Sequence, residues 1–321
     1  MNLLITGAAG YLGKETVRII STQNPSYKIF ASDIRDENPF YGKENIEYHK
    51  LDIRSSELSQ FMNGKDIDVV VHLACMVPGR KKVSRELEYN VDVLGTKNVL
   101  EASGANNVKK IIITSSGAAY GYHADNPDWL NEEDPLRGNY EFAYSHHKKL
   151  VEQLMSEYKE KFPLMKQLIL RPGAILGKTV QNQITNLFDQ PVIWGLRGSD
   201  SPFTFIWDED VVQIIVEGIT SDAEGAFNLA GDGKLSMAQI AKILKKPYIP
   251  LPATLVKTGL FTLNKLGLTT YGPDQINFLR YRPVLSNKKL KAGLFKPRKS
   301  TAETFYYYLQ ENSKEFQEIN L

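Results

Sequence analysis

Short apolar runs along the chain alternate with stretches in which apolar residues recur at helical spacing. The apolar runs predict buried strands at 2–7, 27–33, 46–52, 68–74, 110–116 and 166–172. The helical patterns predict helices at 11–21, up to Met62, at 83–102 and at 140–159. Near-continuous apolar strands that alternate with helices are typical of a parallel sheet covered on both faces. We therefore predict an α/β fold built on a doubly wound parallel sheet.

The regular alternation ends after the sixth predicted strand. Segments that contain glycine and proline follow, and the next helical patterns lie near 210–219 and 236–244. We predict a sheet domain over residues 1–171, with a returning segment near 204–231, and a smaller region that makes up most of 172–321.

Composition and charge narrow the class of protein. The chain has 321 residues and a formal net charge of +2, with basic residues mostly in scattered pairs, so no nucleic-acid partner is expected. No stretch of about 20 apolar residues is present, which predicts no membrane span, and no membrane partner is expected. The first apolar run begins at Asn2, leaving no room for a signal peptide. The single cysteine, Cys75, permits no internal disulfide, so we expect a cytoplasmic protein.

The first predicted strand runs directly into the sequence TGAAGYLG at 6–13. A strand, a glycine turn and the start of a helix form a cradle for a diphosphate. Gly7 permits the tight turn, Gly10 lets the backbone approach the ligand, and Gly13 lets the helix pack close to the strand. This context predicts a Rossmann-type dinucleotide-binding domain.

Asp33 ends the second predicted strand and bears on the choice of cofactor. A carboxylate there can accept hydrogen bonds from both ribose hydroxyls of NAD and would repel the additional phosphate of NADP. Arg35 is a residue type that can hold that phosphate. Asp52, after the third strand, is a further candidate to face the adenine. We expect NAD as the cofactor.

The sequence YEFAYSHHKKLVEQ at 140–153 contains two adjacent histidines. Adjacent residues on a helix point about 100° apart, so His146 and His147 do not easily share one ion, and no metal site is expected. Tyr144 and Lys148 are four residues apart, so their polar ends lie on one face. Taken alone, this pair is either a proton-transfer device or a surface tyrosine and lysine.

Several motifs, in order along the chain, resemble those of the extended short-chain dehydrogenase/reductase family, in its NAD-dependent epimerase/dehydratase branch. Besides the spaced glycines and the Tyr-x-x-x-Lys pair, they are DIR at 52–54, HLA at 72–74, YNVDVLGTKNVLEA at 89–102, TSSGAAYG at 114–121, RPGAILG at 171–177, FIWDEDVV at 205–212 and GAFNLAG at 225–231. The resemblance covers nearly the whole chain. It is specific for the fold and the redox machinery, and much less specific for the substrate.

The resemblance implies a proton-transfer role for Tyr144. A free tyrosine has a pKa of ~10 and is hardly ionised at neutral pH. We expect Lys148 and the cationic nicotinamide to lower this pKa, which makes Tyr144 the general base, or the acid in the reverse direction. Ser116 would hydrogen-bond the substrate oxygen and orient it. His147 replaces the serine that the family usually has there, and packing is favoured for it over lining the site. His146 is expected to meet solvent or a partner subunit.

The resemblance also implies the other binding residues. The cofactor is expected to contact Gly7, Ala9, Gly10, Tyr11, Leu12, Gly13, Asp33, Ile34, Arg35, Asp52, Ile53, Leu73, Ala74, Asn90, Tyr144 and Lys148. The substrate is expected to contact Met76, Ser116, Gly117, Ala118, Pro172, Gly173 and Phe203. The sheet domain would accordingly bind NAD, and the smaller C-terminal region would bind the substrate.

Two positions that commonly contact a nucleotide diphosphate in the family differ here. An asparagine is replaced by Ala174 and an arginine by Phe203. Free UDP, dTDP and GDP are therefore expected to bind weakly unless other donors compensate, and two candidates for that role are Arg80 and Arg197. An apolar wall is expected instead, formed by Phe203 with Phe188 or Trp194.

These residues predict an NAD-dependent oxidoreductase that acts on a secondary alcohol or its ketone. Sugar 4,6-dehydratases carry Asp-Glu after the catalytic hydroxyl residue, where this chain has Gly117 and Ala118, so dehydration is disfavoured. Family analogy favours epimerisation of a sugar or nucleotide sugar. One alternative is a net dehydrogenase or reductase of a less polar substrate, similar to the hydroxysteroid dehydrogenase or flavonol reductase branches. Another is a non-catalytic NAD-binding regulator, against which the intact catalytic residues argue.

A homodimer is also expected. The helices predicted at 83–102 and 140–159 resemble the pair with which family members build a four-helix interface.

Overall fold

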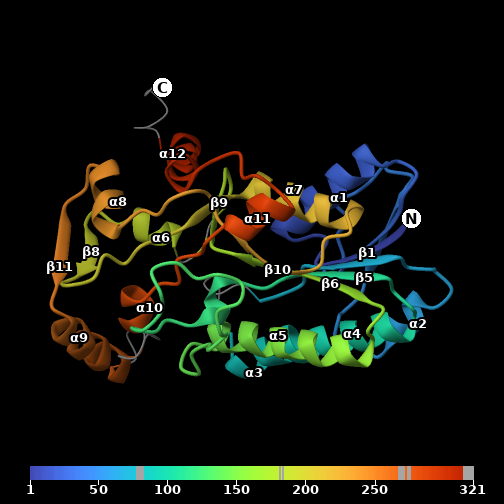
Figure 1. Ribbon diagram of the computed structural model, residues 1–321, viewed down its shortest axis with the longest axis horizontal. Coiled ribbons are helices and arrows are strands. Elements are labelled where there is room, and N and C mark those ends of the chain that lie inside the picture. Colours follow the sequence, from blue (N-terminus) through green and yellow to red (C-terminus); the bar gives the residue numbers. More distant parts are fainter. Residues whose placement is uncertain (77–82, 181, 183, 267–271, 273–275, 314–321) are drawn as a thin grey trace.

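A seven-stranded parallel sheet forms the centre of the protein (Figure 1). The computed structural model describes residues 1–76, 83–180, 182, 184–266, 272 and 276–313. The strands are β1 (Asn2–Thr6), β2 (Lys28–Asp33), β3 (Ile46–Lys50), β4 (Val69–His72), β5 (Lys110–Thr114), β6 (Lys166–Pro172) and β10 (Gly225–Leu229). Their order is β10-β6-β5-β4-β1-β2-β3, and every neighbouring pair is parallel. The predicted doubly wound sheet is confirmed, and all six predicted strands are present.

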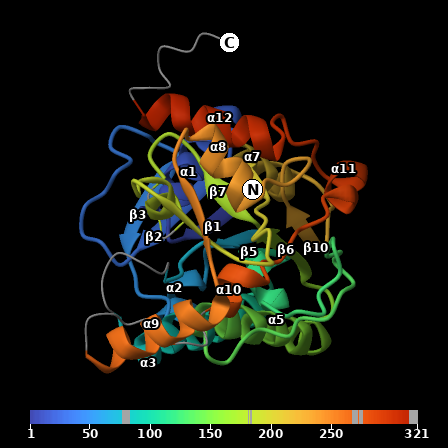
Figure 2. The same ribbon diagram turned by 90° about the vertical axis from the view of Figure 1, so that its left-hand side faces the viewer.

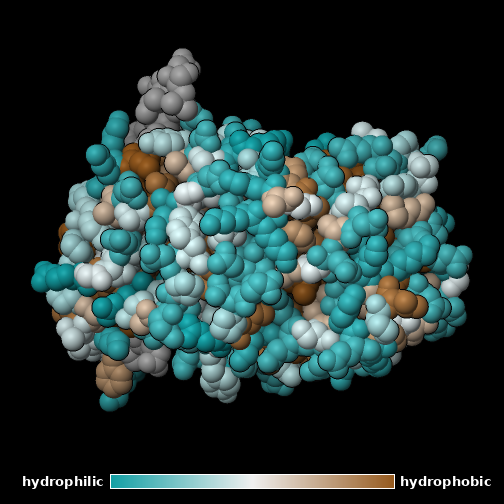
Figure 3. All heavy atoms as spheres, viewed as in Figure 1, coloured by the Kyte–Doolittle hydropathy of each residue, from teal (hydrophilic) through white to brown (hydrophobic). Residues whose placement is uncertain are grey.

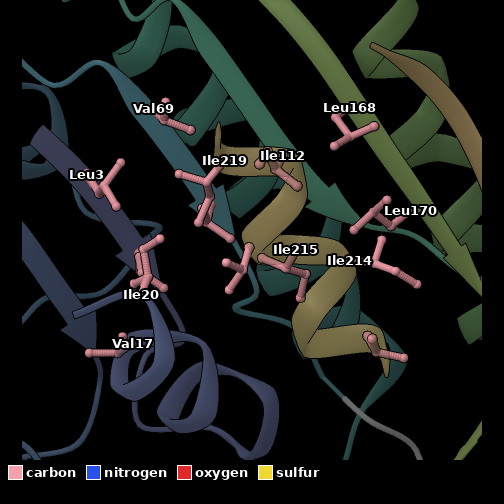
Figure 4. Close-up of a cluster of buried hydrophobic side chains, with 14 of the residues drawn as sticks. Leu3, Val17, Ile20, Val69, Ile112, Leu168, Leu170, Ile214, Ile215 and Ile219 are labelled. Carbon is pink, nitrogen blue, oxygen red and sulfur yellow. The ribbon is translucent and has the colours of Figure 1, made fainter. Parts of the chain in front are cut away.

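Helices cover both faces of the sheet. Successive residues of a strand point to opposite faces, so both sets of side chains become buried. On one face lie α1 (Tyr11–Gln23) and α7 (Asp208–Thr220), and Figure 4 shows Ile215 of α7 beside Ile112 of β5. The opposite face is covered by α2 (Glu57–Met62), α4 (Thr96–Ala105) and α5 (Ala143–Lys161). Burial of one such aliphatic side chain stabilises the fold by about 1.5–3 kcal/mol. This two-sided burial is the reason why the strands appear in the sequence as near-continuous apolar runs.

The strand order reverses between β1 and β4. The chain moves from β1 to β2 and β3 in one direction across the sheet, and from β4 to β5 and β6 in the other. In open parallel sheets a crevice forms at the carboxyl ends of the strands where the order reverses, and ligands bind there. The glycine turn after β1 lies at this position.

Two predicted helices differ in extent. The segment 83–102 is not one continuous helix, because α3 (Arg85–Tyr89) and α4 are separated by a π-helical stretch, η1 (Asn90–Gly95). A Cβ atom on Gly95 would lie 2.6 Å from Cδ1 of Ile53, so η1 packs very closely against the loop after β3. Helix α5 begins at Ala143, later than predicted, since the preceding residues form a turn in which Phe142 N–H donates to the Asn139 carbonyl.

The rest of the chain forms smaller elements beside the sheet. Two short parallel pairs join β7 (Ala174–Leu176) to β9 (Phe205–Trp207) and β8 (Ile193–Leu196) to β11 (Tyr248–Leu251). The helices are α6 (Thr185–Phe188), α8 (Met237–Ile243), α9 (Ala253–Lys265), α10 (Ile276–Arg280), α11 (Lys288–Gly293) and α12 (Thr301–Asn312). Figure 2 shows the end of the molecule at which α8, α9 and α10 lie. The helices predicted near 210–219 and 236–244 are α7 and α8.

These elements surround a hydrophobic cluster of their own. Its largest members include Phe188, Phe205 and Phe305, and the rings of Phe205 and Phe305 stack at 5.6 Å between centroids. The domain boundary near residue 171 stays a prediction. On the face seen in Figure 3 the surface is mostly hydrophilic, with apolar residues in small separate groups.

Candidate active site

The glycine turn is held by close backbone packing. Gly7 has a φ of +70°, and a Cβ atom on it would lie 2.5 Å from the backbone nitrogen of Ala74. A Cβ atom on Gly13 would lie 2.2 Å from the Gly7 carbonyl oxygen, which would push α1 away from β1. The Gly10 N–H donates to the same carbonyl at 2.9 Å. The turn thus leaves the first backbone N–H groups of α1 unobstructed by side chains, and these residues fit the diphosphate of a dinucleotide.

Asp33 lies at the end of β2, directly behind the glycine turn. Its buried carboxylate accepts the Ala9 N–H at 3.0 Å and the Arg35 N–H at 3.2 Å. The Arg35 guanidinium donates to the Ala9 carbonyl and its Nε lies 4.0 Å from the Asp33 carboxylate. Arg35 is therefore already engaged by protein acceptors, and the contact of Asp33 with the ribose hydroxyls of NAD stays a prediction. Ile34, between them, is 65% exposed.

The remaining expected cofactor residues lie along the same edge of the sheet. The Leu73 N–H donates to the Thr6 carbonyl at 3.1 Å, which places Ala74 against the glycine turn. Asp52 and Asn90 line one shallow depression, where Asp52 forms an ion pair of 2.6 Å with Arg54. The hydrogen bond with Arg54 lowers the pKa of Asp52. Ile53 is buried against η1, so its side chain has a packing role.

Tyr11 and Leu12 begin α1. The hydroxyl of Tyr11 donates to the carboxylate of Asp208, at the start of α7, and Leu12 lines the main cavity described below. Tyr11 therefore ties α1 to α7 across the end of the glycine turn.

Ser116, Tyr144 and Lys148 come together at the carboxyl end of β5. Ser116 ends the loop after β5, and its hydroxyl accepts the Ala118 N–H at 3.1 Å. Tyr144 lies in the first turn of α5 and lines the same cavity as Ser116, whose side chain acts to lower the pKa of Tyr144. Lys148 lies one turn further, with Nζ 5.7 Å from the centre of the Tyr144 ring and 2.9 Å from the Thr114 carbonyl, to which it donates. The Tyr-x-x-x-Lys spacing thus brings both side chains to one point, beside Ser116.

Burial determines the protonation of Tyr144. Loss of water raises the pKa of Tyr144 above its ordinary value, and the Lys148 ammonium lowers it by a smaller amount. Lys148 therefore acts on the pKa of Tyr144 in the expected direction without outweighing desolvation, and the lowering by Lys148 and nicotinamide together stays a prediction. Burial also disfavours the charge on Lys148, but Cys75, Tyr144 and Asp92 together raise the pKa of Lys148. Lys148 is held as a cation, and Tyr144 holds its proton as a potential acid.

The two histidines do not line the cavity. His147 is buried and packs edge-on against Tyr89 of α3, with ring centroids 5.7 Å apart. Burial lowers the pKa of His147 to about 4. His146 is partly buried and packs against Tyr140 at 5.2 Å. The preference for a packing role of His147 agrees with this position.

A cavity of ≈ 260 Å³ lies beside the three catalytic candidates. Of the seven expected substrate-binding residues, those that line it are Ser116, Gly117, Ala118, Pro172, Gly173 and Phe203. Met76 is not among the lining residues, and its backbone N–H donates to the Asp92 carboxylate at 2.7 Å. The lining is largely aromatic and aliphatic, with Phe142 and Phe278 facing the cavity beside Phe203.

Arg282 is a cavity residue that sequence reasoning missed. Its side chain is buried between two rings, with Cζ 4.0 Å from the centre of Phe203 and 4.6 Å from that of Phe278. Nε and Nη2 have no hydrogen-bond partner among the residues that the structure describes, and burial lowers the pKa of Arg282 to about 10. A buried guanidinium that lines a cavity is suited to an anionic ligand. No motif or spacing in the sequence links YRP at 281–283 to the catalytic residues.

The other residues expected to contact the substrate do not line the cavity where the structure describes them. Phe188 packs behind Phe203 in the hydrophobic cluster, 6.3 Å between ring centroids, and Trp194 is 54% exposed. Arg197 is exposed and does not line the cavity, whereas Arg80 lies outside the described residues. The proposed apolar wall is thus correct for Phe203 and wrong for the other two aromatic residues.

Comparison with known proteins agrees with this arrangement. A family model described as the NAD dependent epimerase/dehydratase family matches residues 3–230. One relative, from Escherichia coli O157:H7, is N-acetyl-alpha-D-glucosaminyl-diphospho-ditrans,octacis-undecaprenol 4-epimerase; it is 35% identical over 307 residues, which are 91% of this chain and 87% of the relative.

Among the described residues, none of the helices has the length and apolar character that a membrane span requires.

Solved structures share the fold over the whole chain. The UDP-glucose 4-epimerase of Thermus thermophilus, in complex with NAD, has a TM-score of 0.73 at 20% identity, with 100% of both chains covered. UDP-N-acetylglucosamine 4-epimerase from Methanobrevibacter ruminantium has a TM-score of 0.72 at 19% identity, with 98% of both chains covered. The family match extends from β1 to β10 and includes the glycine turn and the catalytic candidates. This chain therefore belongs to the NAD-dependent epimerase/dehydratase family and is an NAD-dependent enzyme of the extended short-chain type.

Proposed function

We propose that the protein is an epimerase that inverts a hydroxyl-bearing carbon of a sugar linked to a diphosphate. The observation that carries this proposal is that Arg282, with two unpaired donor nitrogens, shares one cavity with Ser116, Tyr144 and Lys148. A phosphate supplies the acceptors that the buried guanidinium lacks. The names of the relatives support the same class, since they act on sugars carried on UDP or on undecaprenyl diphosphate.

The protein groups supply proton transfer and orientation. Tyr144 takes the proton of the sugar hydroxyl while that carbon is oxidised to a ketone, and returns it when the ketone is reduced from its other side. Ser116 hydrogen-bonds the same oxygen and holds it in place. The glycine turn and Asp33 would hold NAD, which would supply hydride transfer and a positive charge that favours the phenolate. The C–H and O–H bonds that break both re-form, so the overall reaction is redox-neutral.

Elimination of water is not supported by the cavity. Gly117 and Ala118 line it directly after Ser116, and neither has an acidic or basic side chain. Net oxidation or reduction of a less polar substrate fits the aromatic lining but leaves the Arg282 donors unused. Epimerisation of a diphosphate-linked sugar uses both features.

The test is turnover of defined sugar diphosphates. NAD-loaded protein is incubated with UDP-glucose, UDP-N-acetylglucosamine and a polyprenyl diphosphate-linked N-acetylglucosamine, and the released sugars are separated by chromatography. We expect one substrate to give its 4-epimer without accumulation of reduced nicotinamide, and no product with Tyr144→Phe. Failure with every substrate would overturn the proposal, and stoichiometric reduced nicotinamide would favour the net dehydrogenase.

Arg282→Met tests the anion site separately. We expect the KM for the active substrate to rise by roughly tenfold to a hundredfold, the loss associated with a charge-assisted hydrogen bond of about 1.5–3 kcal/mol. Inorganic pyrophosphate should compete with the substrate in the unmodified protein. It should not compete in the Arg282→Met variant. Arg280→Met is the matched control, since Arg280 is two residues away in α10 and does not line the cavity. Equal effects of both substitutions would remove Arg282 from the site.

A further inference from the structure

Helix α9 is unlike the other helices of its length. α1, α7 and α9 each have 13 residues, and α1 and α7 bury Val17, Ile20 and Ile214 completely. Of the described side chains of α9, none is buried. Leu255 is 58% exposed and Phe261 56%, and Leu266, directly after the helix, is 65% exposed. An apolar helix that the described part of the chain leaves uncovered indicates a binding surface.

The short pair of strands that precedes α9 also carries exposed apolar residues. Trp194 of β8 and Ile249 of β11 are partners in the parallel register, and they are 54% and 40% exposed. β11 leads into α9 through Pro252 alone, and Figure 1 shows β8, β11 and α9 at the same end of the molecule. We call Trp194, Ile249, Leu255, Phe261 and Leu266 the α9 surface.

The charge of this region favours an anionic partner. Between Lys234 and Lys265 the sequence contains six lysines and no aspartate or glutamate. Lys257 and Lys265, both exposed, lie on α9 itself. A helix with large apolar side chains and lysines but no acidic residues is typical of helices that lie in the interface of an anionic membrane.

The α9 surface adjoins the cavity. α9 packs against α10, and Phe278 of α10 lines the cavity together with Arg282, two residues after the end of this helix. A diphosphate held by Arg282 could thus carry a chain that leaves the cavity toward α9. The relative that is 35% identical is named for a sugar on undecaprenyl diphosphate, in which such a chain is a membrane lipid.

We propose that the α9 surface docks on an anionic membrane, and that the sugar diphosphate of the proposed reaction is presented there on a polyprenyl lipid. The substrate in this inference rests on the proposed function, and the docking rests on the α9 surface. This proposal replaces the expectation of no membrane partner, which was based only on the lack of a membrane-spanning stretch in the sequence.

The docking test uses the whole NAD-loaded protein and vesicles. Flotation is measured with vesicles of phosphatidylglycerol and phosphatidylethanolamine, and with vesicles of phosphatidylcholine alone. We expect binding to the anionic vesicles, weakened by salt, and a loss of roughly tenfold or more in the double variant Leu255→Glu, Phe261→Glu. Leu164→Glu is the matched control, because Leu164 is 93% exposed and lies between α5 and β6. Absence of flotation, or equal flotation of both variants, overturns the docking.

Turnover separates this inference from the proposed function. Epimerisation of polyprenyl diphosphate-linked sugar in vesicles should fall in the α9 variant, while epimerisation of a short-chain, water-soluble isoprenyl analogue should stay within about twofold. Epimerisation of UDP sugars alone, without flotation, would keep the proposed function and reject this inference. A halved mass of the α9 variant by light scattering would show that a second copy covers the surface, and would also reject it.

Discussion

The proposed proton transfer depends on one phenol hydroxyl, that of Tyr144. Replacing Tyr144 with phenylalanine removes this hydroxyl and keeps the ring. We expect turnover to fall by about 10²–10⁴, the usual contribution of a positioned acid or base, while the affinity for NAD measured by calorimetry changes little. Tyr140→Phe is the control, since Tyr140 lies one turn earlier and is 67% exposed. Substantial residual activity of Tyr144→Phe would assign the proton to another residue.

The carboxylate of Asp33 predicts that the protein binds NAD more tightly than NADP. Placing the additional phosphate of NADP beside this buried carboxylate should cost about 1–3 kcal/mol, or roughly tenfold to a hundredfold in affinity. Titration calorimetry with both cofactors measures it directly. Tighter binding of NADP would mean that Arg35 leaves its contacts with Asp33 and Ala9 to hold the phosphate.

Single residues also show what the sequence could and could not reveal about the site. Tyr144 and Lys148 were predictable because helical spacing alone brings them together. Arg282 reaches the cavity only because the C-terminal segment folds back over it, and no local pattern records that path. Phe203 was expected as an apolar wall, but it also forms the platform on which Arg282 stacks. The missing part of the prediction was therefore tertiary contact between distant segments.

At the scale of elements, strands were easier to predict than helix interruptions. The central strands are apolar on both faces, so their sequence signal is strong. The π-helical stretch η1 has no such signal, since it depends on the contact between Gly95 and Ile53, which lie on different segments. The seventh strand, β10, resembled a family landmark in the sequence, and its pairing with β6 comes from the structure.

The packing of α5 on α3 predicts a dependence of stability on pH. His147 joins the two helices through Tyr89, and burial lowers its pKa from an ordinary 6.5 to about 4. As the pH falls from about 6.5 to about 4, the unfolded chain binds a proton at this position before the folded chain does, so the free energy of unfolding decreases.

We expect His147→Phe to reduce the decrease in unfolding free energy at acidic pH. Urea unfolding at pH values of about 7 and about 5 gives the comparison, and the variant should show the smaller difference in unfolding free energy. An unchanged difference would mean that His147 titrates alike in the folded and unfolded chains.

At the scale of the whole molecule, we still propose a homodimer. Leu87, Tyr89 and Leu94 on α3 and η1 are 39%, 38% and 44% exposed, in the helices expected to form the interface. Burying them between two copies would stabilise the pair. Light scattering at micromolar concentration should give the mass of a dimer, and Leu94→Glu that of a monomer. A monomeric unmodified protein would reject the proposal.

The pairing of β10 with β6 also has a consequence for the order of events during synthesis. β6 ends at Pro172, but the strand that covers its outer edge begins only at Gly225, and α7, which covers Leu168 and Leu170, comes between them. A nascent chain that has just left the ribosome after β6 therefore presents an unpaired strand edge and an uncovered apolar face. Such an edge pairs readily with other chains. Chaperone demand during translation should consequently be greatest between the emergence of β6 and that of β10.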